Sequence, residues 1–259
     1  VLSPVDFSAV EDTGVTQTRL NAFELPKMPM TSYYEHNRRA RGEAFLEKLL
    51  AGETCALVTD AGTPAVSDPG EDLVALCAEH DVPFIPIPGG CAAVCALAAS
   101  GLPTGRWCFE GFLSVNKKAR REHLDTLQGE KRTMIFYEAP HKLCATLRDL
   151  RDAFGGDRRL SLSRELTKLH EQTLRMTLDE AVAYFDANAP RGEFVLILEG
   201  APDEPETEQD EAERLASAAE AVRRRMEQGQ TQKDAVKAVS AETGVKKNAL
   251  YRYVLDHEE

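Results

Sequence analysis

The sequence predicts an α/β protein with two α/β domains and a small C-terminal helical domain. Three observations support this fold class. Short apolar runs alternate with amphipathic segments over the first 200 residues, which is the order of a sheet covered by helices. A length of 259 residues is enough for more than one domain. The composition, 42% hydrophobic and 29% charged, is that of an ordinary globular chain.

The first half of the chain shows a βαβα order. Residues 54–59 form an apolar run typical of a strand, and residues 71–80 have the apolar spacing of a helix. Residues 83–87 are expected to form the next strand, and residues 91–100 an Ala-rich helix that ends at Gly101. This order predicts a parallel sheet with helices on its faces.

The second half repeats the alternation. Strands are expected at 107–113, 133–137, 159–163 and 193–198, and helices at 141–154 and 178–186. We therefore expect an N-terminal α/β domain over 1–105, a C-terminal α/β domain over 106–200, an acidic linker and helix over 201–230, and a helix-turn-helix-like tail over 231–259. Gly244 marks the turn between the two helices of that tail.

The net charge of −12 argues against a uniformly basic nucleic-acid binder. The charge is uneven, however. It is −8 over 1–105, +1 over 106–200 and −5 over 201–259, where seven acidic residues lie between Asp203 and Glu213. The near-neutral second domain therefore remains compatible with a local RNA-contacting face.

Several protein classes lose support. No apolar run is long enough to span a membrane, and no signal segment precedes the first domain. The six cysteines form no C-x-x-C pair, which is typical of buried thiols in a reducing compartment, so the cytoplasm is expected. No metal-ligand spacing, P-loop, G-x-G-x-x-G or G-x-S-x-G pattern is present.

The loop 60–70, DAGTPAVSDPG, carries the strongest local signal of a site. It follows a predicted strand, and ligands of open α/β sheets bind at the carboxyl ends of strands. Asp60 and Asp68 can accept hydrogen bonds from hydroxyl or amino groups, and eleven residues is long for an ordinary β–α connection. We interpret this loop as functional.

Three other segments are compatible with either function or structure. Pro88-Gly89-Gly90 precedes a helix whose N-terminus can hold an anion. Phe136-Tyr137-Glu138 ends a strand and could contact a flat ligand. The segment 164–170 places four ionisable groups after another strand.

A basic cluster, Lys117, Lys118, Arg120 and Arg121, indicates a phosphate contact or a solvated helix start.

Together these motifs resemble a known family. VTDAGTPAVSDPG, PIPGG, GLPTGRWCFEGFL, FYEAPHK, RELTKLHEQTLRMTL and RGEFVLILEG occur in the order seen in the ribosomal RNA small subunit methyltransferase I family. That family belongs to the tetrapyrrole (corrin/porphyrin) methylase superfamily. The resemblance runs from about Glu11 to the C-terminus.

The resemblance implies an S-adenosylmethionine-dependent 2′-O-methyltransferase that acts on a cytidine of 16S rRNA in the small ribosomal subunit. It implies two α/β domains with the methyl donor between them and a homodimer, with no role for membrane or DNA. The residues implied on the donor side are Asp60, Ala61, Gly62, Thr63, Pro64, Asp68, Pro69, Pro88, Gly89, Phe136, Tyr137, Glu138, Arg191, Gly192 and Glu193.

Glu165 and Lys168 are the candidate catalytic residues near the reacting hydroxyl. The tail resembles the small helical domain of the family, and its basic second helix indicates an RNA contact, with a helical hairpin packed on the body as the alternative. The candidate RNA-binding residues are Lys117, Lys118, Arg120, Arg121, Lys246, Lys247 and Arg252.

The sequence departs from the family pattern at three places. Family members usually begin with a strand carrying a TPIGN-type loop, which does not precede Val1, so the first strand of the N-terminal domain is expected to be missing. Gly14 replaces an Arg, and Gly90 and Cys91 replace Pro-Ser. Two other functions stay open: methylation of a tetrapyrrole or another small molecule, and non-catalytic ribosome binding.

Overall fold

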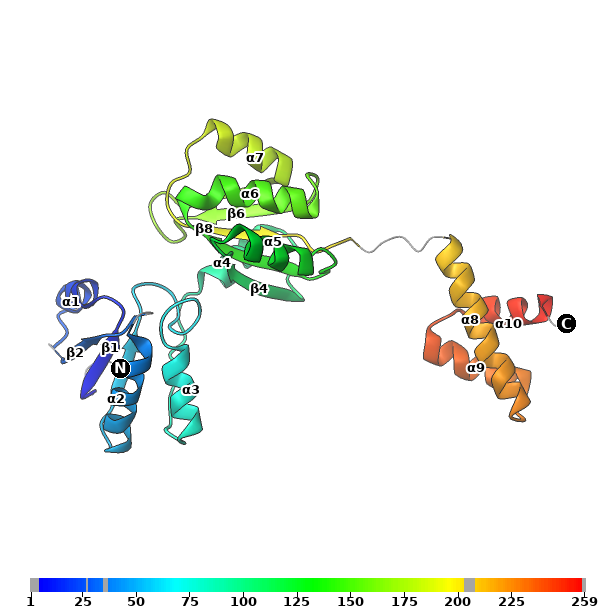
Figure 1. Cartoon of the computed structure of the whole chain (residues 1–259), viewed down its shortest axis with the longest axis horizontal. Coiled ribbons are helices and arrows are strands. Elements are labelled where there is room, and N and C mark those ends of the chain that lie inside the picture. Colours follow the sequence, from blue (N-terminus) through cyan, green and yellow to red (C-terminus); the bar gives the residue numbers. More distant parts are fainter. Residues whose placement is uncertain (1–4, 27, 35–36, 203–207, 258–259) are drawn as a thin grey trace. The chain divides into compact units, whose positions relative to one another are not determined.

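The computed structural model describes residues 5–26, 28–34, 37–202 and 208–257. It divides into a unit that ends at Ala201 and a second unit that begins at Pro202 (Figure 1). The first unit contains two sheets and the second contains only helices. No helix in the described ranges is both long and apolar enough to cross a membrane. The two-sheet α/β architecture with C-terminal helices confirms the predicted fold class.

The first sheet has three parallel strands in the order β2-β1-β3. Phe7 and Ala9 of the central strand pack with Phe45 and Leu73 in a small core, and the rings of Phe7 and Phe45 lie 5.5 Å apart. The elements of this region are β1 (Phe7–Val10), α1 (Thr13–Ala22), β2 (Met30–Ser32), α2 (Arg38–Leu50), β3 (Cys55–Val58) and α3 (Glu71–Glu79).

The second sheet has five strands in the order β4-β5-β8-β6-β7. Its elements are β4 (Trp107–Phe112), β5 (Thr133–Glu138), β6 (Arg159–Arg164), β7 (Gln172–Thr177) and β8 (Phe194–Leu198), with helices α5 (Lys117–Thr126), α6 (Pro140–Phe154) and α7 (Leu178–Ala187) between them. The strands and helices expected here are present within two residues of the predicted bounds, but β7 was not predicted.

The expectation of a parallel arrangement is wrong for this sheet. Only β4 and β5 run parallel, whereas β8 runs antiparallel to both β5 and β6, and β6 runs antiparallel to β7. The connection between β6 and β7 is a loop of seven residues, 165–171. Parallel strands need a crossover of a dozen or more residues, so such a short loop dictates an antiparallel pair.

The two faces of the second sheet are covered by different helices. Helices α5, α6 and α7 cover one face, where Met134 and Phe136 join the main core. Helix α4 (Ala92–Ser100) covers the other face and packs on Ile135, Val195 and Ile197. Successive side chains of a strand point to opposite faces of the sheet, so neighbouring residues of β5 and β8 belong to different cores.

The segment 83–87, expected to be a strand, has no regular secondary structure, so that prediction is wrong. Phe84, Ile85 and Ile87 are exposed, with Ile85 at 83%. Apolar composition supplies strand propensity, but a strand forms only where a neighbour pairs with its backbone. The domain boundary near residue 105 stays a prediction; the helix before it, α4, packs on the second sheet.

The C-terminal unit consists of three helices, α8 (Glu208–Glu227), α9 (Gln232–Thr243) and α10 (Lys247–Asp256). Val222 of α8, Val236 of α9 and Leu250 of α10 are fully buried in one shared core. Helix α8 is therefore part of the helical unit and not an extension of a linker. Gly244, with φ of 72°, ends α9 at the expected turn. The acidic residues at 203–207 lie outside the described residues.

Candidate active site

The loop 60–70 begins at a shared edge of two parallel strands. Glu11 directly follows β1, and its Oε2 accepts hydrogen bonds from Thr59 Oγ1 at 2.7 Å and from the Asp60 backbone N–H at 3.1 Å. The carboxyl ends of β1 and β3 therefore meet at the start of this loop, where open α/β sheets bind ligands. Sequence reasoning did not single out Glu11 for the site, although a carboxylate directly after a strand is the signal that marks it.

Five carboxylates lie around this loop, and their charges act on Asp60 and Asp68. Burial raises the pKa of Asp68, and the charges of Glu11, Glu193 and Asp60 raise it further, against a hydrogen bond from Thr59. Burial and the charges of Glu11 and Asp12 likewise raise the pKa of Asp60. An acid whose pKa is raised by its neighbours lies in a negative potential. The loop thus offers a favourable environment for a cation.

Unusual backbone geometry concentrates in the two loops predicted to be functional. Among the described non-glycine residues, six have positive φ, and four of these lie in loops 60–70 and 165–171: Ala65, Ser67, Glu165 and Thr167. Positive φ is energetically unfavourable for a non-glycine residue. Residues held in this conformation are found preferentially at ligand-binding sites. The two loops therefore share a feature that ordinary connections seldom have.

Loop 60–70 contacts the segment before α4 and the second sheet. Thr63 Oγ1 donates to the Gly90 carbonyl at 3.3 Å. A Cβ placed on Gly111, in the bulge of β4, would lie 3.9 Å from Ser67 Oγ. The donor-side residues therefore come from loops that lie near one another. Loop 60–70 holds Asp60, Ala61, Gly62, Thr63, Pro64, Asp68 and Pro69, and the exposed segment before α4 holds Pro88 and Gly89.

Of the three residues Phe136, Tyr137 and Glu138, only Tyr137 faces α4. Its hydroxyl accepts from the Ala93 N–H at 3.1 Å, and burial is the main cause that raises its pKa to about 12. Phe136 lies fully buried in the core on the opposite face. The buried carboxylate of Glu138 accepts from the Ala139 N–H at 2.8 Å and from the Thr146 hydroxyl at 2.5 Å. Cofactor contacts by Phe136 and Glu138 stay predictions.

The two candidate catalytic residues contact each other. Lys168 Nζ lies 3.0 Å from Glu165 Oε1 at the start of the β6–β7 loop. A Cβ on Gly192 would lie 2.8 Å from the same oxygen, so glycine is needed for Glu165 to take this position. The segment before β8, which holds Arg191, Gly192 and Glu193, therefore lies against the loop of the candidate catalytic residues; the Arg191 carbonyl also accepts from Arg164 at 3.3 Å.

Two side chains of the basic cluster lie close to a carboxylate, and the other two do not among the described residues. Arg120 is only 12% exposed and lies 2.6 Å from Asp149 on α6, and Lys118 lies 3.8 Å from Glu122. Lys117 and Arg121 are exposed and pair with no residue among those described. In the C-terminal unit, Lys246, Lys247 and Arg252 are exposed on or just before α10.

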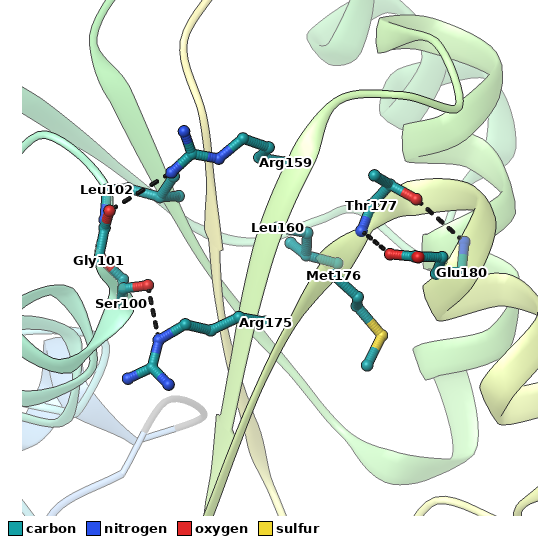
Figure 2. A pocket seen from close by; sticks show the side chains of 9 residues that line it. All are labelled: Ser100, Gly101, Leu102, Arg159, Leu160, Arg175, Met176, Thr177 and Glu180. Atoms are coloured by element: carbon teal, nitrogen blue, oxygen red, sulfur yellow. Dashed lines mark hydrogen bonds between the residues drawn. The ribbon is translucent and has the colours of Figure 1, made fainter.

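A cavity of about 300 Å³ lies elsewhere in the first unit (Figure 2). It is lined by the end of α4 and by Arg159 and Arg175, whose guanidinium groups donate to the last carbonyls of that helix. Arg159 begins β6, whereas the catalytic loop follows its last residue, about 17 Å further along the strand. The two arginines offset the partial negative charge at the C-terminus of α4, and this structural role accounts for their position.

The fold and the loops together define a class of protein. Residues 9–182 match the family model of the Tetrapyrrole (Corrin/Porphyrin) Methylases. The crystal structure of the methyltransferase CobJ has a TM-score of 0.56 at 20% identity and covers 77% of this chain and 85% of its own. The crystal structure of a diphthine synthase has a TM-score of 0.52 at 13% identity, covering 76% and 80%. These likenesses show the shared fold.

Closer relatives identify the family. A Synechocystis protein named ribosomal RNA small subunit methyltransferase I is 46% identical over 99% of this chain and 90% of its own length. An Escherichia coli O157:H7 protein of the same name is 40% identical over 100% of this chain and 88% of its own. The chain belongs to the ribosomal RNA small subunit methyltransferase I family, and it is a methyltransferase.

Proposed function

We propose that this chain transfers a methyl group from S-adenosylmethionine to the ribose 2′-hydroxyl of a cytidine in 16S rRNA of the small ribosomal subunit. The observation that carries the proposal is the position of segment 191–193 between the two loops: the charge of Glu193 acts on Asp68, and Gly192 lies against Glu165, which contacts Lys168. The names of the relatives favour ribosomal RNA over a tetrapyrrole and favour catalysis over ribosome binding alone.

The residues present fit the methyl donor. A sulfonium with an amino-acid group and two ribose hydroxyls needs negative potential and hydrogen-bond acceptors. Burial is the main cause that raises the pKa of Asp60 and Asp68, and the charges of the neighbouring carboxylates, which raise it further, supply that potential. Gly89 leaves its backbone open, since a Cβ there would meet nothing within 4 Å. We assign the donor to loop 60–70, Pro88, Gly89, Tyr137 and the segment 191–193.

The bound donor supplies an electrophilic methyl group to an in-line displacement. The chain orients the hydroxyl for this displacement, which is where much of the rate originates. As the oxygen–methyl bond forms and the carbon–sulfur bond breaks, the hydroxyl proton passes to Glu165. Lys168 holds that carboxylate in place, and its positive charge stabilises the negative charge that develops on the oxygen.

The RNA is proposed to contact the exposed basic residues of α5 and of the C-terminal unit. Phosphates attract such side chains through a salt-dependent interaction. We also propose that the enzyme works as a homodimer in the cytoplasm, where its ribosomal substrate would be found. Sedimentation analysis of the purified chain measures the oligomeric state, and a monomer at all concentrations contradicts the dimer.

Methyl transfer from a labelled donor tests the function directly. The purified chain is incubated with small ribosomal subunits, free 16S rRNA and a tetrapyrrole in parallel, and the modified nucleoside is identified by mass spectrometry. We expect label in one cytidine as its 2′-O-methyl derivative. Label in the tetrapyrrole alone, or no label together with tight subunit binding, would establish one of the other two functions instead.

Two substitutions test the catalytic assignment. We expect Glu165→Gln and Lys168→Ala to lower kcat on small subunits, with a loss of about 10²–10⁴-fold for the base. Binding of S-adenosylmethionine, measured by calorimetry, should change little. His170→Gln, in the same exposed loop, is the control and should keep wild-type activity. Near wild-type kcat in both test variants contradicts the assignment.

A further inference from the structure

Phe112 is the last residue of β4 and remains 54% exposed although it belongs to a strand. Its ring packs against Tyr137 edge-to-face at 5.6 Å, and Tyr137 also packs edge-to-face with Phe109 at 5.1 Å. The Tyr137 hydroxyl accepts from the Ala93 N–H. The exposed ring therefore has a supporting aromatic contact on one side and a surface open to a ligand.

The neighbours of this ring have the chemistry of a single-stranded nucleic acid site. Lys117 lies five positions after Phe112 in the sequence, so their Cα atoms are at most about 18 Å apart. Lys117 and Arg121 are one helical turn apart on α5, both exposed and unpaired among the described residues. Arg120 anchors this turn by donating to the Ser114 carbonyl at 3.2 Å and by its contact with Asp149. An exposed aromatic residue a few positions before exposed cations is typical of surfaces that stack bases and hold phosphates.

The residue that precedes Phe112 lies near the donor-side loop. This residue, Gly111, approaches Ser67 of loop 60–70 so closely that a Cβ would lie 3.9 Å from Ser67 Oγ. A base stacked on Phe112 therefore places its ribose near the residues assigned to the methyl donor. We propose that Phe112 stacks on a nucleobase at or next to the target cytidine, while Lys117 and Arg121 hold the adjoining phosphates. This inference rests on the proposed function.

Substitution of Phe112 tests the stacking contact. Phe112→Leu keeps an apolar side chain but removes the aromatic face, so affinity for small subunits should fall about 5- to 150-fold, as measured for lost base stacking. Phe112→Trp should stay within a few-fold of wild type. Trp107→Leu, at the other end of β4, is the matched control and should bind normally. S-adenosylmethionine binding and thermal unfolding of Phe112→Leu should match wild type.

Salt dependence tests the phosphate contacts. Removal of two phosphate contacts by Lys117→Ala with Arg121→Ala should lower the slope of log affinity against log salt by about 1.4. Arg148→Ala with Arg151→Ala removes two arginines that already face Asp186 and Asp152, and it should leave the slope unchanged.

The outcomes separate this inference from the proposed function. Wild-type subunit affinity in Phe112→Leu overturns the stacking contact even where the wild-type chain methylates RNA. A wild-type chain that binds subunits but transfers no methyl group contradicts the proposed function, and the affinity of Phe112→Leu then still decides the inference. A chain with no affinity for subunits overturns both.

Discussion

The two sheets of the first unit differ in how thoroughly they are buried. Every residue of β8 and five of six in β5 are buried, and both faces of their sheet are covered by helices. In the first sheet, all residues of β2 and β3 are only partly buried, and the core is limited to Tyr33 and a few side chains from β1, α2 and α3. The first region nevertheless carries Glu11, Asp60 and Asp68, three of the carboxylates proposed for the donor side.

The first region has less packing of its own to stabilise it than the second region has. A ligand that binds only the folded state adds stability that grows with the logarithm of its concentration over Kd. We therefore expect the methyl donor to stabilise the first region more than the second. The second region provides the fixed support on which the catalytic loop and the aromatic residues are held.

The largest expected effect comes from removing packing in the second region. Leu147→Ala empties a fully buried position in the main core and should cost near the upper end of about 2–5 kcal/mol. Leu73→Ala, in the smaller core of the first region, should cost near the lower end, because partly exposed neighbours can move into the space.

Urea unfolding with two probes measures this contrast. Trp107 is the one tryptophan of the chain and begins β4, so its fluorescence follows the second region, whereas circular dichroism follows both. We expect Leu73→Ala to shift the dichroism transition to lower urea and to leave the fluorescence transition nearly in place. Coincident transitions in both variants mean that the two sheets unfold as one, and the comparison then fails.

A glycine substitution tests whether the donor-side loop depends on its backbone geometry. Gly70 has φ of 142°, and a Cβ there would lie 2.5 Å from Leu57 Cδ2. Gly70→Ala should therefore cost about 2–4 kcal/mol from strain and overpacking, and should weaken donor binding. Gly129→Ala, where a Cβ meets nothing within 4 Å and φ is not positive, should leave stability and binding unchanged. Equal effects of the two substitutions contradict a special role for the loop.

We expect the ionisation of Asp68 to make both stability and donor binding depend on pH. Stability should fall as pH rises, whereas donor binding should strengthen. Burial and neighbouring carboxylates raise its pKa in the folded chain. The folded chain therefore binds more protons than the unfolded chain, and this contribution to stability is present at low pH and lost as pH rises through the raised pKa. Binding of a cationic donor needs the ionised form, so it should strengthen over the same pH window.

Asp68→Asn tests both signs at once. It should raise the unfolding temperature at neutral pH while it weakens S-adenosylmethionine binding, and it should flatten the pH dependence of each. Asp125→Asn, an exposed acid on α5, serves as the control. Lower thermal stability of Asp68→Asn at neutral pH contradicts the negative potential assigned to the loop.

The sequence predicted correctly those strands whose formation depends mainly on the composition of a short segment. The apolar runs 133–137 and 193–198 supply the buried strands β5 and β8, so these two strands were predicted correctly. Strand partners are set by the whole chain, so the order of β8 between β5 and β6 and the failure of 83–87 to form a strand could not be predicted locally. Strand β7 was missed because Arg175 and two threonines mask its apolar positions.

The candidate site shows the same limit. Asp60 and Asp68 were predicted because one loop contains both of them, whereas Glu11 and Phe112 join the site only through pairing of distant strands. The basic cluster is a set of four adjacent charges in the sequence, but the structure engages Arg120 with Asp149 and leaves Lys117 and Arg121 exposed. Which charge is free depends on the packing of α5 against α6, which the sequence does not display.

The smallest expected change in stability comes from the basic cluster of α5, where Arg120 is engaged and Lys117 and Arg121 are exposed. Arg120→Ala removes a contact with Asp149 and a hydrogen bond to the Ser114 carbonyl, and the arginine is largely buried, so it should cost about 1–2 kcal/mol. Lys117→Ala with Arg121→Ala removes two exposed charges and should change stability by less than about 0.5 kcal/mol. Chemical unfolding followed by Trp107 fluorescence resolves this difference. If the double variant is the less stable of the two, Lys117 and Arg121 contribute to the fold, and their assignment as free contacts for RNA is wrong.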